Sequence, residues 1–468
     1  MRLDLLALVL AKRRALRGRE RWPSERIAAH QRARVDELLQ FAAARSPYYR
    51  ALLPQRRANN TAGSRGAPEA ALAAIPPLTK ATLMSRFDEI ATDPRVRLAD
   101  VERFLADGGG RFAGRYWVAA TSGSSGRRAI MPENLREWTA TIASYARAQE
   151  WAGVQPRLTS RSRMAVVSST SLSHQSALVG AAVKSPFLVT ERYDAGAPLA
   201  QTVAALNRFQ PELLVAYASM LAVLADEQRA GRLAITPRAV NASSEPLTVE
   251  MRARVREAWG VECFDVYAAT EASGIAAECH AHRGLHVFDD LVILEIVDDA
   301  GRPVAAGETG TQALVTVLSS RTLPIIRYQL TDRIRTLPED QAAAPCPCGR
   351  TFRRIAGVEG RTDDVLRLPR EDGGTALVHP VVFHRVLEAT PVAGWQVRQR
   401  AGALEVLLAQ PAIGVDADQL AAAIAAAVER TGARRPTVRA ITVEAIPAGA
   451  AGKRPRIVAD PTATGAAP

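Results

Sequence analysis

The stretch "YWVAATSGSSGRRAIMPEN", residues 116–134, places a polar, glycine-containing turn between two apolar runs. The run "YWVAA" is typical of a buried strand, and the glycines after it allow backbone conformations that other residues avoid. Hydroxyls and backbone amides in such a turn can face a chain of phosphates, and Arg127 or Arg128 adds a fixed positive charge. The stretch therefore predicts an anion-binding loop, with a solvated turn between strand and helix as the alternative. Its candidate residues are Thr121, Ser122, Gly123, Ser124, Ser125, Gly126 and Arg127.

After this loop, short apolar runs alternate with segments of helical periodicity. Such alternation over some 150 residues predicts an α/β domain with a mainly parallel sheet flanked by helices, whose ligands gather at the carboxyl ends of the strands. The expected strands are "RMAVVSST" (163–170), "PELLVAYAS" (211–219), "RAVNASS" (238–244) and "CFDVYAAT" (263–270), and the expected helices cover 198–209, 219–231 and 247–260.

Two further changes of pattern divide the rest of the chain. From residue 287, strands separated by turns predict an antiparallel β subdomain. After "GVEGRTDD" (357–364), a hairpin, a helix and a strand predict a small α+β domain. We therefore expect a large N-terminal domain over 1–360 and a small, mobile C-terminal domain over 361–468. A helix with Ser24 as its N-cap is expected over 24–46.

The composition excludes several classes of protein. At 468 residues the chain is long enough for two domains, and 47% hydrophobic with 23% charged residues is the balance of a globular protein. The net charge of +12 comes from arginine spread along the chain, without a basic stripe interleaved with aromatics, so nucleic-acid binding is not expected. No apolar run is long enough for a membrane span, and the N-terminus lacks the order of a signal peptide. A cytoplasmic protein is expected.

Four later segments supply chemistry that would complement a phosphate-binding loop. "YAATEASG" places Tyr267, Thr270 and Glu271 after a strand, where a carboxylate can hold magnesium against a phosphate. "RYQLTDRI" places Asp332 at a strand end, suited to accept ribose hydroxyls. "EGRTDD" and "IPAGAAGKRPRIV" add Arg361 at the domain boundary and Lys453 on a glycine-rich turn. The alternatives are a strand-end salt bridge, a charge at a helix N-terminus and an ordinary surface lysine.

Taken in order, these motifs resemble the adenylate-forming superfamily of acyl-CoA synthetases, adenylation domains and luciferases. The resemblance is closest to the phenylacetate-CoA ligase-like branch. It covers most of the chain, although each motif alone is weak. The residues that carry it are "TSGSSG", "SSEPL", "YAATEASGIAAEC", "GLHVFDD", "PIIRYQLTDRI", "CPCGR", "GRTDD" and the late "GK".

The resemblance implies that a carboxylic acid, with an aromatic acid favoured, attacks the α-phosphate of ATP, and that coenzyme A or a phosphopantetheine thiol then displaces AMP. The serine-rich loop would wrap the β- and γ-phosphates, although the usual lysine after the loop is replaced here by Arg127 or Arg128. For the nucleotide, the resemblance implies adenine contacts from Ser243, Ser244, Glu245, Pro246 and Tyr267, an α-phosphate contact from Thr270, ribose binding by Asp332 and a ribose or phosphate contact from Arg361. Glu271 would bind magnesium, and Lys453 would be the lysine that acts during adenylation. Asp363 would be the hinge, and His174 and Tyr217 would line the acyl pocket.

Cysteine and histidine gather in "ECHAHRGLH" (278–286) and "CPCG" (346–349). Two cysteines spaced C-x-C are poor disulfide partners but can both reach one metal, and thiolates with an imidazole favour zinc. Cys279, Cys346 and Cys348 with one histidine would close a tetrahedral, structural site. His286 is the favoured fourth ligand because of the "GLH" motif, with His282 as the second choice; reduced thiols on a turn are the alternative.

Other readings stay open at this point. The acceptor could be an acyl carrier protein, an amine or another nucleophile, because such enzymes share the residues that bind ATP. A nucleotide-binding protein without catalysis is a further alternative, supported by the missing loop lysine. Related ligases are often dimers, so a homodimer is open as well.

Overall fold

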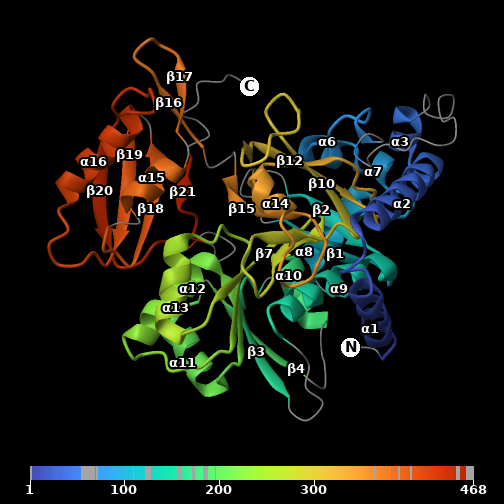
Figure 1. Cartoon of the computed structure of the whole chain (residues 1–468), viewed down its shortest axis with the longest axis horizontal. Coiled ribbons are helices and arrows are strands. Elements are labelled where there is room, and N and C mark those ends of the chain that lie inside the picture. The colour runs from blue at the N-terminus through green and yellow to red at the C-terminus, as the bar shows by residue number, and fades with distance from the viewer. Residues whose placement is uncertain are drawn as a thin grey trace.

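The computed structural model describes residues 3–53, 69, 72–108, 110–121, 128–154, 161–170, 174–182, 188–195, 197–361, 365–378, 380–387, 390–400, 403–448 and 454–459. Among the helices in these ranges, none has the combination of length and apolar character that crossing a bilayer requires. Figure 1 shows the N-terminal helices and the C-terminal elements at opposite ends of the molecule.

The first hundred residues form helices that pack against the large core. Leu5 and Val9 of the first helix, α1, are buried with Trp138 and Ile142. The expected helix at residue 24 begins there, but Pro23 occupies the N-cap position, so the expected cap at Ser24 is wrong by one residue. The helices are α1 (Leu3–Arg17), α2 (Ser24–Arg45), α3 (Pro47–Leu52), α6 (Lys80–Ser85), α7 (Phe87–Ile90) and α8 (Leu98–Asp107).

A ten-stranded sheet organises the middle of the chain, in the order β11-β14-β15-β9-β8-β7-β6-β5-β3-β4. Its parallel half confirms the strands expected from the apolar runs. The central strands β5 and β6 are buried along nearly their whole length, as expected where helices cover a parallel sheet, whereas the edge strand β4 is largely accessible. These elements are β3 (Ser162–Ser168), α10 (Gln175–Ala182), β4 (Leu188–Asp194), α11 (Leu199–Phe209), β5 (Leu213–Tyr217), α12 (Ala218–Arg229), β6 (Ala239–Ser243), α13 (Val249–Trp259) and β7 (Cys263–Ala269).

The other half of this sheet is antiparallel, so the sheet as a whole is mixed. β7, β8 and β9 follow one another through short connections, which join antiparallel neighbours, and β14 and β15 then add further antiparallel pairs. They are β8 (Ser273–Glu278), β9 (Leu285–Val287), β11 (Thr309–Gly310), β14 (Asp332–Thr336) and β15 (Arg354–Arg361). A separate antiparallel sheet of β10 (Val292–Val297), β12 (Gln312–Val317) and β13 (Tyr328–Leu330) matches the expected β subdomain.

The serine-rich loop connects a two-stranded hairpin of β1 (Trp117–Ala120) and β2 (Ile130–Glu133). After β2 comes α9 (Leu135–Trp151), which begins with a complete capping box. Asn134 accepts from the amides of Arg136 and Glu137, and Glu137 accepts from the amide of Asn134. The cap fixes the start of α9 directly behind the loop.

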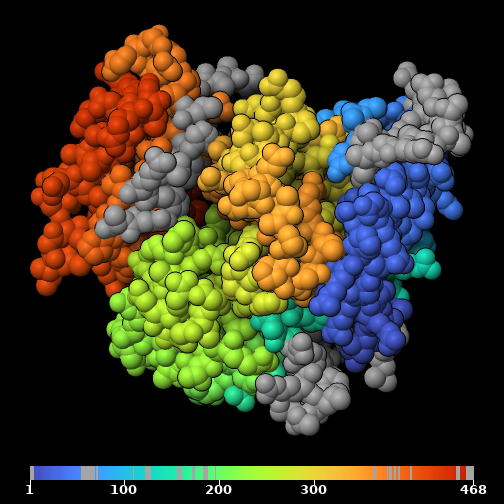
Figure 2. Space-filling view, viewed as in Figure 1, coloured from blue at the N-terminus to red at the C-terminus, as the bar shows by residue number. Residues whose placement is uncertain are grey.

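The C-terminal part forms its own four-stranded sheet, in the order β20-β19-β18-β21, with its own buried core. The hairpin, helix and strand expected there are present. Arg254 of α13 reaches this part and donates to the carbonyls of Val392 and Ala393 at 2.9 and 3.1 Å. Figure 2 shows the two parts in contact. The remaining elements are α14 (Glu339–Ala343), β16 (Leu366–Pro369), β17 (Thr375–Val378), α15 (Pro380–Leu387), β18 (Gly394–Arg400), β19 (Ala403–Ala409), α16 (Ala417–Glu429), β20 (Thr437–Val443) and β21 (Ile457–Val458).

Candidate functional site

Three residues predicted to bind the nucleotide meet where β7, β14 and β15 present their ends. Asp332 opens β14 and lies opposite Arg361 in the register of β14 and β15. The hydroxyl of Tyr267 donates to Asp332 Oδ2 at 2.8 Å, and Arg361 Nε donates to Asp332 Oδ1 at 3.2 Å. Tyr267 and Asp332 are buried, whereas Arg361 is half exposed on its side chain. The carboxylate is therefore held in one orientation by a neutral and a charged donor.

Glu271 joins this group through a tyrosine that sequence reasoning did not single out. The buried Tyr328 donates its hydroxyl to Glu271 Oε1 at 2.9 Å. Burial raises the pKa of Glu271, while the hydroxyl of Tyr328 and the charges of Arg361 and Lys80 oppose that rise. Tyr328 lies within the quoted motif "PIIRYQLTDRI", and Lys80 is one of the few lysines of the chain, but neither signal identifies a partner for Glu271.

Lys80 is brought near the group by backbone pairing. The amide of Leu78 donates to the carbonyl of Arg327, and the amide of Gln329 donates to the carbonyl of Leu78. This bridge places the start of α6 beside β13. The cluster therefore contains two carboxylates, two tyrosyl hydroxyls and two cations within the described part of the chain.

The residues predicted to line the adenine and acyl sites lie at the ends of β5 and β6. Tyr217 is paired with Ser243 across these strands, and its hydroxyl accepts from the amide of Ser169 at 2.9 Å. Ser244 has a left-handed backbone (φ 67°), an uncommon conformation for a serine that marks a sharp change of direction after β6. Glu245 Oε2 accepts from the amide of Ser219 at the start of α12 at 2.9 Å. Pro246 follows on the surface.

Thr270 and His174 are connected through the residue that follows His174. Gln175 opens α10, and its side-chain amide donates to the carbonyl of Thr270 at 3.1 Å. His174 is partly buried immediately before this helix. The geometry thus places the segment expected to line the acyl pocket against the segment that carries Glu271.

The predicted phosphate-binding loop is described only at its edges. Thr121 closes the turn, because its amide donates to the carbonyl of Ala129 and its hydroxyl accepts from the amide of Ala129 at 2.9 Å. Residues 122–127, which include five of the predicted loop residues and Arg127, lie outside the described residues. The same holds for Asp363 and Lys453, so their roles stay predictions.

The cysteine and histidine candidates converge as expected from their spacing. The ligand atoms of Cys279, His286, Cys346 and Cys348 all lie within 4.8 Å of one another, and all four residues are buried. Cys279 Sγ is 3.6 Å from Cys346 Sγ, and Cys348 Sγ is 3.4 Å from His286 Nε2. His282 instead places Nδ1 at 3.3 Å from Glu278 and packs its ring on Phe264, so His286 is the histidine of the set.

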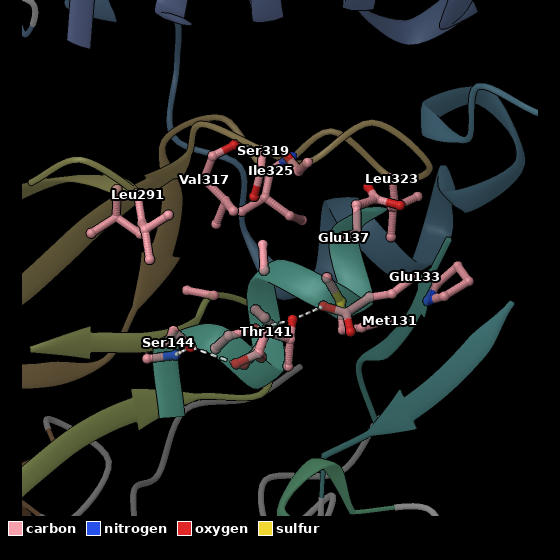
Figure 3. Close-up of a pocket in the computed structure, with 18 residues that line it drawn as sticks. Met131, Glu133, Glu137, Thr141, Ser144, Leu291, Val317, Ser319, Leu323 and Ile325 are labelled. Carbon is pink, nitrogen blue, oxygen red and sulfur yellow. Dashed lines mark hydrogen bonds between the residues drawn. The ribbon is translucent and has the colours of Figure 1, made fainter. Parts of the chain in front are cut away.

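A small cavity of ≈ 40 Å³ lies beside the loop that carries Glu271, lined by α9, β2 and the segment after β12 (Figure 3). Glu133, Thr141 and Ser144 face it, and sequence reasoning had assigned none of them to a site. Burial raises the pKa of Glu133 to about 8. These residues have the ordinary polar pattern of a strand end and a helix, so the sequence carries no signal for them.

The sequence of this chain is similar to sequences of phenylacetate-coenzyme A ligases. No family model matches the chain. A phenylacetate-coenzyme A ligase of Thermus thermophilus is 27% identical over 382 residues, which cover 80% of this chain and 77% of the relative. A phenylacetate-coenzyme A ligase of Escherichia coli is 35% identical over 127 residues, which cover 26% of this chain and 27% of the relative.

The fold is also that of solved ligases. A structure of 2-hydroxyisobutyryl-CoA ligase in the postadenylation state, in complex with 2-HIB-AMP, superposes with a TM-score of 0.72 at 20% identity, covering 95% of this chain and 92% of that one. The same ligase in the thioesterification state superposes with a TM-score of 0.59 at 21% identity, covering 94% and 91%. The superposition over 95% of the chain shows that the chain shares this fold.

Proposed function

We propose that the chain belongs to the phenylacetate-CoA ligase-like branch of the adenylate-forming superfamily and is an ATP-dependent, AMP-forming ligase. It activates a carboxylic acid, with aromatic acids the favoured class, and transfers the acyl group to the thiol of coenzyme A. The observation that carries the proposal is the meeting of Glu271 and Asp332, distant in sequence, in one cluster with Tyr267, Tyr328 and Arg361.

Each residue of the cluster has a role in this proposal. Asp332 accepts the ribose hydroxyls, oriented by Tyr267 and by Arg361, which also stands close to the phosphates. Glu271 supplies the carboxylate for magnesium, the hard cation that prefers oxygen ligands and accompanies the triphosphate. Thr270 contacts the α-phosphate. Catalysis of this kind is positioning and charge stabilisation, because the attacking carboxylate and the leaving pyrophosphate are both anionic.

The remaining predicted residues complete the proposal; of these, residues 122–127, Asp363 and Lys453 lie outside the described part of the chain. The serine-rich loop from Thr121 to Arg127 wraps the β- and γ-phosphates, and Lys453 bridges the acid and the α-phosphate during adenylation. Asp363 is the hinge about which residues 361–468 turn as a small domain. Tyr217 and His174 border the acyl pocket, and Ser244, Glu245 and Pro246 border the adenine.

The four-residue cluster is proposed as a structural zinc site. With Zn–S near 2.3 Å and Zn–N near 2.0 Å, tetrahedral coordination separates two thiolates by about 3.8 Å and a thiolate from an imidazole nitrogen by about 3.5 Å. The observed separations of 3.6 and 3.4 Å fit these values. His286 directs Nδ1 at the carbonyl of Phe352 at 3.2 Å, which leaves Nε2 for the metal. Zinc there would pin the segment after β8 to the loop after α14.

The experiment that tests the function offers the purified protein ATP, magnesium, coenzyme A and a panel of aromatic and aliphatic acids. Mass spectrometry should detect an acyl-CoA thioester formed together with AMP for at least one acid. Formation of an acyl adenylate without thioester would favour a carrier protein or an amine as the acceptor. Absence of both products with every acid, in protein that binds MgATP, would favour a nucleotide-binding protein without catalysis.

A further inference from the structure

A directed chain of hydrogen bonds crosses the interior beside the candidate site. Thr141 of α9 donates its hydroxyl to Glu133 Oε1 at 2.8 Å, as Figure 3 shows. The hydroxyl oxygen of Thr141, Oγ1, also lies 2.8 Å from Ser273 Oγ. Because a hydroxyl has a single proton, Ser273 is the donor in that second bond. Gln175 donates to Ser273 Oγ at 3.3 Å and accepts from the hydroxyl of Tyr145 at 2.9 Å.

The chain of bonds ends on the backbone of the segment that carries Glu271. The amide of Gln175 that reaches Ser273 also donates to the carbonyl of Thr270. One turn further along α9, Ser144 accepts from the amide of Gly274 at 3.1 Å. A side chain at Gly274 would place a Cβ 2.9 Å from Ser144 Oγ and from Phe288, so only glycine allows this approach. Residues 270–274 are thus held at both ends by buried polar side chains.

The held segment has a conformation that it would not adopt unaided. Ser273 has φ 61°, in the left-handed region that is costly for residues other than glycine, asparagine and aspartate. The residue as a whole is 8% exposed, and Thr141 and Gln175 are each 3% exposed, so water cannot replace their bonds. The direction of Glu271 therefore depends on side chains from α9 and α10.

These contacts join three parts of the site that are remote in sequence. Glu133 ends the strand that follows the serine-rich loop, Gln175 follows His174 at the expected acyl pocket, and Thr270 begins the segment with Glu271. We propose that Thr141 and Gln175 are positioning residues for adenylation, which set the placement of Thr270 and Glu271 and link that placement to the α10 segment beside the acid. This inference rests on the proposed function and extends it to residues that touch no substrate.

Loss of these hydrogen bonds should slow the adenylation step more than it weakens the binding of the substrates. Small misplacement of reacting groups costs up to about 100-fold in rate, because catalysis depends on near-attack geometry. In Thr141→Val the shape of the side chain is kept and both hydrogen bonds are lost. Thr141→Ser keeps the hydroxyl and removes a methyl group, so it is the matched control. Gln175→Met keeps the length and removes both donors.

The test measures kcat and KM for pyrophosphate exchange, with an acid that the wild type accepts, and MgATP affinity and urea unfolding for each variant. We expect a tenfold or larger fall in kcat for Thr141→Val and Gln175→Met, KM for the acid within threefold of wild type, and kcat for Thr141→Ser within threefold of wild type. In the double variant Thr141→Val/Gln175→Met, kcat should fall by less than the product of the two single falls, because both residues bind Ser273 Oγ, although Gln175 also binds the carbonyl of Thr270.

The outcomes separate this proposal from the proposed function. Unchanged kcat in folded Thr141→Val, or an equal fall in Thr141→Ser, would overturn the positioning role. If the wild type exchanges no label with any acid, the proposed function fails and MgATP affinity decides the inference. Weaker MgATP binding in Thr141→Val, together with wild-type affinity in Thr141→Ser, would then support positioning of the segment. Equal MgATP affinities in all variants would overturn it.

Discussion

The hydrogen bond from Tyr328 to Glu271 can be removed by a single substitution, which tests the role of the cluster directly. Tyr328→Phe removes one hydroxyl and keeps a ring that is 2% exposed, so the packing should survive. The lost bond, of 2.9 Å, is made to the carboxylate assigned to magnesium. Hydrogen bonds to charged groups contribute about 1.5–3 kcal/mol, so kcat/KM for MgATP should fall about 10- to 100-fold.

The pH dependence of this variant gives a second readout. Burial raises the pKa of Glu271, and the hydroxyl of Tyr328 opposes that rise by stabilising the ionised carboxylate. Its removal should raise the pKa further, so the acidic limb of the pH profile of kcat/KM should move to higher pH. The loss of activity should therefore be larger at pH 6 than at pH 8.

The control for this variant is Tyr49→Phe. Tyr49 is equally buried, and its hydroxyl donates to the carbonyl of Pro324 at 3.0 Å, a neutral acceptor away from the carboxylates. This variant should lose about 0.5–1.5 kcal/mol of unfolding free energy and keep its activity. Equal kcat/KM in Tyr328→Phe and wild type across the pH range would refute the assignment of Glu271 to the metal.

Three other predictions concern stability. Cys346→Ser should lower both the zinc content, measured by plasma mass spectrometry, and the urea concentration at the midpoint of unfolding. The control Cys263→Ser replaces a buried thiol outside the cluster and should leave the zinc content unchanged. Equal zinc contents in the two variants would reject the site. Asp290→Asn should cost about 3–5 kcal/mol of unfolding free energy, because it removes the carboxylate that binds the fully buried Arg147 through two hydrogen bonds and leaves only Glu20, at 3.7 Å, to balance its charge; a loss under 1 kcal/mol would contradict this. As pH rises from 5 toward 8, Glu133→Gln should become more stable relative to wild type, by up to about 1.4 kcal/mol per pH unit. The reason is that folded wild type keeps the proton on Glu133 up to about pH 8, whereas the unfolded chain has already released it. If the free energies of unfolding of the two proteins change with pH in parallel, the raised pKa is contradicted.

The sequence allowed the parallel half of the sheet and the cysteine cluster to be predicted because both depend on local signals. Apolar runs such as 213–217 are long enough to mark strands buried on both faces, and the C-x-C spacing marks a pair of ligands. The choice of His286 over His282 followed from the motif, and the register of β9 with β15 brings His286 to Phe352 and Cys348.

The support around the site could not be predicted in the same way. Thr141 and Ser144 are ordinary polar residues on a helix, and their role appears only when α9 packs on β8. Tyr328 meets Glu271 although its strand, β13, belongs to a different sheet from β7, which precedes Glu271. Both features depend on tertiary packing, which leaves no periodic trace in a single sequence.

The central claim is that this cluster activates an acid at the expense of the α–β phosphate bond of ATP. Acid-dependent exchange of labelled pyrophosphate into ATP, measured without coenzyme A, tests that claim most directly. We expect exchange in the wild type and at least a 100-fold lower rate in Asp332→Ala. Release of ADP and phosphate in place of exchange, or equal exchange in Asp332→Ala, would contradict it.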